Sequence, residues 1–199
     1  MTIPPRDGSR RRFTVAERWI HRSTAGLLGT TLITAAFLYL PMLSELAGRR
    51  YLLVTVHEWS GIAAPVPVLA GLLSRAFRAD LARLNRFGQH DRGWWRAALR
   101  RRPHPSGKFN AGQKLYASLL AGGTLVMIGT GLILWFPRLA PLVYRTGATF
   151  VHDWGALLLG ALVAGHIGKA SNDPEARAGL RTGFVSDAWA RRHHELWEE

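Results

Sequence analysis

The 199-residue sequence contains no cysteine. It therefore cannot form a disulfide, ligate an iron–sulfur cluster of its own, or attach a haem covalently through a C-x-x-C-H motif. A redox cofactor would have to be held by other side chains. Histidine, of which the chain has 8, is the obvious remaining ligand.

Acidic residues are also few, with 13 Asp and Glu against 26 Lys and Arg. A basic chain can indicate nucleic-acid binding, so the distribution of the charges matters. Residues 1–22, 75–114 and 169–199 hold 22 of the positive residues, and the two remaining connections hold only 4. This asymmetry is the positive-inside bias of a membrane protein with cytoplasmic termini. It accounts for the charge, and we expect no nucleic-acid partner.

The apolar residues are concentrated in a few long runs. A helix of about 20 residues crosses the ~30 Å hydrocarbon core of a bilayer. The sequence predicts an all-α integral membrane protein, a bundle of four transmembrane helices that run up and down with both termini in the cytoplasm. The predicted spans are Ser23 to Ser44, Tyr51 to Ser74, Leu115 to Phe136 and Gly147 to Gly168.

Histidines recur at two depths of this bundle. His152 and His166 are separated by close to four helical turns, so they leave one face of the fourth helix about 21 Å apart along its axis. His57 lies near the outer end of the second helix and His21 at the cytoplasmic end of the first. Depth therefore predicts an outer pair, His57 with His152, and an inner pair, His21 with His166.

Each pair has the composition of a haem site, because haem iron can be held between two neutral imidazoles that come from different helices. Ionisable residues inside a membrane are costly and are usually functional. The alternative is that these are interfacial histidines whose polar tips reach water or headgroups. We expect His193 and His194, in the charged C-terminal segment, to be solvated.

Two local patterns add detail to the bundle. Pro65 and Pro67 predict a kink in the second helix. The stretch GKFNAGQK, residues 107–114, directly precedes the third helix, and its Asn110 is a favourable N-cap residue.

The order of the four histidines, together with the GKFNAGQK stretch, resembles the dihaem cytochrome b subunit of membrane-bound formate dehydrogenases. Hydrogenase cytochrome b subunits belong to the same wider group. The resemblance covers about residues 13–170. It implies two haem b groups with the four histidines as axial ligands to iron. It further implies that the subunit takes electrons from a catalytic module at the outer face and reduces a quinone near the cytoplasmic face.

The resemblance also implies a quinone pocket, for menaquinone or ubiquinone, beside the inner haem. Its residues would be Asn110, Gly112, Gln113, Lys114 and His166. The partners would be iron–sulfur and molybdopterin-type catalytic subunits, and the chain would have no substrate-oxidising residues of its own. The expected location is the bacterial cytoplasmic (inner) membrane.

These expectations divide the chain into three parts: a cytoplasmic basic N-terminus (1–22), a four-helix haem-binding membrane domain (23–168, including a cytoplasmic loop at 75–114) and a cytoplasmic C-terminal tail (169–199). Two other functions remain open. One is an autonomous dihaem cytochrome b that oxidises superoxide and reduces quinone, and the other is a haem-free membrane anchor.

Overall fold

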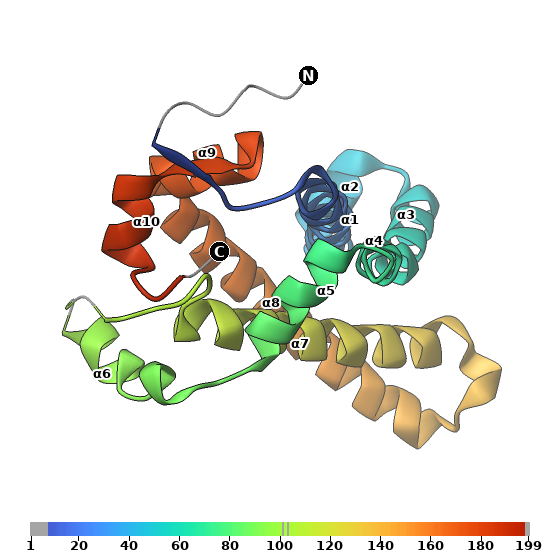
Figure 1. Cartoon of the computed structure of the whole chain (residues 1–199). Helices are drawn as coiled ribbons and strands as arrows, with labels where there is room; N and C mark the ends of the chain where they lie inside the picture. Colours follow the sequence, from blue (N-terminus) through green and yellow to red (C-terminus); the bar gives the residue numbers. More distant parts are fainter. Residues whose placement is uncertain (1–7, 101, 103, 198–199) are drawn as a thin grey trace. The chain divides into compact units, whose positions relative to one another are not determined.

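The fold is known from a computed structural model that describes residues 8–100, 102 and 104–197. It is all-α as predicted, apart from two strands of three residues each. The elements, shown in Figure 1, are β1 (Ser9–Arg11), α1 (Val15–Tyr39), α2 (Pro41–Ala47), α3 (Arg50–Ala63), α4 (Val66–Gly71), α5 (Arg75–Asn85), η1 (Gln89–Asp91), α6 (Trp94–Leu99), α7 (Ala111–Trp135), η2 (Pro137–Leu139), α8 (Leu142–Ser171), α9 (Pro174–Thr182), β2 (Phe184–Ser186) and α10 (Asp187–His193).

The predicted membrane spans correspond to the long helices. Within the described residues, three stretches are long and apolar enough to cross a membrane: Arg50–Gly71, Ala111–Trp135 and Leu142–Ser171. A fourth candidate consists of α1 and α2, which are bent by 104° relative to each other. The bend falls at Pro41, near the residue where the sequence predicted the first helix to end. Pro65 separates α3 from α4, so the helix is interrupted at the position of the predicted kink, although Arg50–Gly71 still forms one candidate span.

The chain divides into two compact units. The first contains residues 1–19, 71–119 and 165–199, and the second contains residues 20–70 and 120–164. The first therefore holds the loop before α7 and the C-terminal segment. The second holds most of the apolar length of the long helices.

In the second unit, small residues bring helices close together. A Cβ atom on Gly123 of α7 would lie 2.8 Å from the side chain of Leu159 of α8, and one on Gly155 would lie 2.7 Å from Met127. The hydroxyls of Thr31 and Ser60 join α1 to α3 at 2.9 Å. Close packing and hydroxyl contacts of this kind hold helices together in lipid, where apolar burial contributes little.

The first unit has a small core of its own. Strand β1 pairs with β2 in antiparallel fashion, with Arg10 opposite Val185. Val185 packs with Trp189, Ala190 and Trp197 to form a buried cluster. The pairing of β1 with β2 joins the two ends of the described chain, because one strand follows residue 8 and the other lies close to residue 197.

Candidate functional site

His57 and His152 lie next to each other in the second unit. Their ring centroids are 6.1 Å apart and their ring planes form an angle of 73°. Both residues are half-buried. Two iron–nitrogen bonds of about 2 Å each, together with the radii of the two imidazole rings, would place the centroids of an axial pair about 6 Å apart. The spacing of these two side chains fits a haem iron.

The ring of His57 is fixed through its Nδ1 atom. This nitrogen lies 3.1 Å from the backbone oxygen of Thr31 and 3.1 Å from the hydroxyl of Thr34. A carbonyl oxygen only accepts hydrogen bonds, so Nδ1 carries the proton and donates it. The Nε2 atom is then left with a lone pair that can bind a metal.

His152 has the same arrangement on the other side of the site. Its Nδ1 atom lies 2.9 Å from the hydroxyl of Thr130 on α7. That hydroxyl donates its own hydrogen to the backbone oxygen of Val126 at 2.8 Å, so it accepts from Nδ1–H. A Cβ atom on Gly131 would lie 3.3 Å from the imidazole ring, so the small residue leaves room for it.

The two threonines, Thr34 and Thr130, are therefore part of the site, although they did not stand out in the sequence. Metal-binding histidines almost always donate their second ring nitrogen to a fixed acceptor, which sets the tautomer and the ring orientation. The signal available in the sequence was a hydroxyl within an apolar run at the depth of a histidine. With α1 and α7 supplying the acceptors, all four long helices contribute to this site.

The other two predicted ligands fall in different units. His21 lies on an exposed part of α1 in the second unit, and His166 lies on α8 in the first. Within the first unit, His166 stacks on Tyr116 of α7, with ring centroids 4.8 Å apart and planes at 12°. Tyr116 was not singled out in the sequence. The pairing of His21 with His166 stays a prediction.

The GKFNAGQK stretch forms the start of α7. The side chain of Asn110 accepts a hydrogen bond from the backbone N–H of Gln113, and the side chain of Gln113 accepts one from the backbone N–H of Asn110, both at 2.9 Å. This is a reciprocal capping box, so the predicted N-cap is confirmed. At Gly112 a Cβ atom would overlap the ring of Trp94, so this position needs a residue without a side chain.

Lys114, at the end of the stretch, is only 4% exposed. Its ammonium group donates to the carboxylate of Asp91 at 2.7 Å and to the backbone oxygen of Arg86 at 2.9 Å. Burial tends to raise the pKa of Asp91, but the hydrogen bonds from Lys114 and from the backbone of Gly88, together with the charge of Lys114, outweigh it, so the pKa lies below its usual value. Lys114 thus fixes the preceding loop to α7 as part of a buried ion pair.

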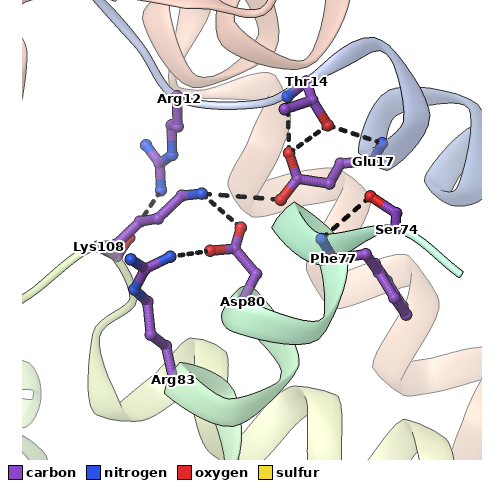
Figure 2. A network of polar contacts seen from close by, with 8 residues as sticks. All are labelled: Arg12, Thr14, Glu17, Ser74, Phe77, Asp80, Arg83 and Lys108. Atoms are coloured by element: carbon purple, nitrogen blue, oxygen red, sulfur yellow. Dashed lines mark hydrogen bonds and ion pairs between the residues drawn. The ribbon is translucent and has the colours of Figure 1, made fainter. Parts of the chain in front are cut away.

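A second buried ion cluster surrounds Lys108, also in this stretch. Figure 2 shows its ammonium group between the carboxylates of Asp80 and Glu17. Asp80 also accepts a hydrogen bond from Arg83 at 2.7 Å. Burial, followed by the neighbouring Glu17, raises the pKa of Asp80. The cluster joins the stretch to α1 and α5 within the first unit.

The two histidines near the C-terminus have different surroundings. His193 is exposed, as predicted. The prediction for His194 was wrong, because this residue is only 3% exposed. Burial, with the nearby charge of Arg12, lowers the pKa of His194 to about 4. The physical reason is that the C-terminal segment folds onto the core of the first unit, which a local charge pattern does not reveal.

Comparison with known proteins finds similarity to cytochrome b556 subunits of formate dehydrogenases. The chain is 30% identical over 94 residues to the cytochrome b556(Fdn) subunit of the nitrate-inducible formate dehydrogenase of Escherichia coli K12. The matched region covers 46% of this chain and 43% of the relative. The cytochrome b556(fdo) subunit of that organism is 30% identical over 98 residues, 46% and 45% of the two chains. The cytochrome b556 subunit of a Haemophilus influenzae formate dehydrogenase is 28% identical over 95 residues, 46% and 40%.

The chain thus spans less than half the length of these relatives. A family model described as prokaryotic cytochrome b561 covers much more of it and matches residues 12–171. That range begins just before α1 and ends at the last residue of α8, so it contains every candidate span and all four predicted haem ligands. The protein is therefore a multi-pass membrane protein that belongs to the prokaryotic cytochrome b561 family.

Proposed function

We propose that the protein is a dihaem cytochrome b. In this proposal it takes electrons from a partner dehydrogenase at the outer face of the membrane and delivers them to a quinone near the cytoplasmic face. Its family implies haem b. The number of haems, the ligands, the quinone and the partner are the finer parts of the proposal, and a different observation supports each of them.

The observation that carries the proposal is the environment of His57 and His152. The 6.1 Å separation of the rings suits a shared iron, and the hydrogen bonds at both Nδ1 atoms leave both Nε2 atoms able to bind it. A haem held there would supply one-electron redox chemistry. His57 and His152 would hold it, and Thr34 and Thr130 would keep each imidazole in one tautomer with Nε2 free to bind iron.

His21 and His166 are proposed as the ligands of the second haem. Helix α8 is continuous from Leu142 to Ser171, so it can carry one ligand to each haem. Along such a helix, His152 and His166 are about 21 Å apart. The parallel stacking of Tyr116 on His166 would fix the plane of the inner imidazole.

The quinone is proposed beside the GKFNAGQK stretch, with Asn110, Gly112, Gln113, Lys114 and His166 as its surroundings. An open surface depression of about 290 Å³ lies at this end of α7, lined by Phe87, Asp91, Gly93, Trp94, Trp95, Ala111 and Leu115, neighbours of the proposed quinone residues rather than those residues themselves. Ligand pockets of drug-sized molecules begin at about 300 Å³, so this depression has room for a quinone ring but not for a whole isoprenoid quinone. Asn110 and Gln113 use part of their hydrogen-bonding capacity in the helix cap, and each amide keeps further donors.

The partner dehydrogenase and the direction of electron transfer are supported by the relatives and by the distribution of charge. The three relatives are subunits of formate dehydrogenases. The concentration of positive residues in 1–22, 75–114 and 169–199 supports cytoplasmic termini and a cytoplasmic loop. Under that topology, an electron that moves inward works against the membrane potential, at up to about 2.3 kcal/mol per 100 mV.

Spectroscopy of the purified protein tests the proposal. We expect two b-type haems per chain in a reduced-minus-oxidised spectrum, and reoxidation of both by a soluble naphthoquinone. Co-purification with an iron–sulfur subunit would support the partner. Quinone reduction by the isolated protein with superoxide as donor would instead support an autonomous enzyme, and a chain without haem would contradict the proposal.

Thr130→Val provides a finer test of the outer site. The valine has nearly the same shape but cannot accept the hydrogen bond from His152 Nδ1. Loss of such an outer contact typically weakens metal binding about 10- to 100-fold, so we expect faster loss of one haem to apomyoglobin. Thr146→Val on helix α8 is the matched control, because the hydroxyl of Thr146 is exposed and donates to the backbone oxygen of Leu142. Equal haem retention in both variants would contradict the assigned role of Thr130.

A further inference from the structure

The C-terminal segment forms a clamp on the first unit. We define the clamp as residues 184–197, which comprise β2, α10 and the turn that follows. Trp189 and Trp197 of the clamp are buried in the core, and the guanidinium group of Arg12 lies 4.5 Å from the ring of Trp189. The clamp is therefore held to the N-terminal segment by the pairing of β1 with β2 and by a cation–π contact.

The clamp binds the backbone directly before the proposed quinone residues. His194 Nδ1 lies 2.7 Å from the backbone oxygen of Gly107, and the backbone N–H of Leu196 donates to the backbone oxygen of Ser106 at 3.1 Å. The next backbone oxygen, that of Lys108, accepts a hydrogen bond from Arg12 at 3.4 Å, as Figure 2 shows. Three consecutive carbonyl groups are thus held by the two ends of the chain.

His194 is buried, as is Arg12, the other side chain in this set of donors. Because a carbonyl accepts only, its Nδ1 carries the proton in the bond to Gly107. The imidazole packs against Trp189, with ring centroids 5.0 Å apart, and edge-on against Trp197 at 6.4 Å. A buried, hydrogen-bonded ring with aromatic neighbours on two sides has little freedom to move.

We propose that His194 is a positioning residue for the quinone site. It acts through Gly107, three residues before Asn110, and fixes the entry of the chain into α7. Since the family match ends at residue 171, this control comes from a segment beyond it. The inference rests on the proposed function, because it assumes that a quinone binds at the GKFNAGQK stretch.

The test compares His194→Ala with His193→Ala, which changes the exposed neighbour. The probe is menadione, and the readouts are its KM and kcat together with the haem spectrum of the purified protein. We expect about a tenfold rise in KM for His194→Ala, equivalent to the loss of one good hydrogen bond, with kcat and both haems unchanged. His193→Ala should match the unmodified protein.

His194→Asn should restore most of the affinity, because its amide N–H can replace the Nδ1–H donor. If His194→Ala does not accumulate, His194→Leu removes the donor and keeps an apolar side chain of similar volume. An unchanged KM in the alanine or leucine variant would overturn the proposed positioning role of His194. Absence of menadione reduction by the unmodified dihaem protein would overturn the proposed function itself, and the inference with it.

Discussion

His152→Ala is expected to leave the protein with one haem in place of two. His152 is held by Thr130 and faces His57 at 6.1 Å, so its removal takes away one of two ligands from the proposed outer site. A single imidazole in an apolar site retains haem poorly, because the iron loses both a bond and its fixed geometry. The inner haem depends on other residues and should remain. Haem per chain, measured by the pyridine haemochrome, gives the result.

The pairing of ligands is tested by the pattern across variants. His57→Ala should remove the same spectral component as His152→Ala, whereas His166→Ala should remove the other one. His193→Ala, at an exposed position, serves as the control for an unrelated histidine. A full haem complement in His152→Ala would refute the outer pair, and loss of both haems with retained folding would refute the independence of the two sites.

Lys108→Met should cause the largest loss of stability in the first unit. Lys108 is the cation shared by two buried carboxylates: its side chain is 9% exposed, that of Glu17 is 7% and that of Asp80 is 6%. Methionine keeps much of the length but removes the charge. Removal of one partner from a buried ion pair typically costs about 3–5 kcal/mol, because the remaining charge is uncompensated. For a chain of this size we expect Tm to fall by about 10 °C.

The loss of stability expected for Lys108→Met depends on pH. Without Lys108, one of the two carboxyl groups should take up a proton, since like charges that are close together raise a pKa. The pKa of Asp80 is already raised by burial. A raised pKa in the folded state means that stability is lost as pH rises through it. The deficit of Lys108→Met should therefore be larger at alkaline than at acidic pH.

The matched control is Lys169→Met, which removes an exposed lysine from the last turn of α8. An exposed charge contributes little, so this variant should melt close to the unmodified protein. Asp80→Asn combined with Lys108→Met should recover part of the loss, because it removes one of two neighbouring like charges. Equal melting of the two lysine variants would show that the cluster contributes no net stability.

The sequence determined the features that depend on local chemistry. Apolar runs of about 20 residues form membrane helices because the bilayer leaves no other partner for backbone groups. A proline at position 65 breaks a helix, and Asn110 caps one, since both effects act within a few residues. The depth of each histidine follows from its position within its apolar run, which is why depth alone predicts that His57 lies opposite His152.

Which side chains support these residues follows only from how the helices pack. Thr34 and Thr130 are ordinary helix residues until the fold brings each to the Nδ1 of a histidine on another helix. His194 reads as a solvated residue in a charged segment until its contact with Gly107, 87 positions earlier, is formed. Membrane spans, helix caps and helix breaks follow from interactions between residues close together in the sequence. Burial and hydrogen-bond partners depend instead on packing between segments that are far apart in the sequence.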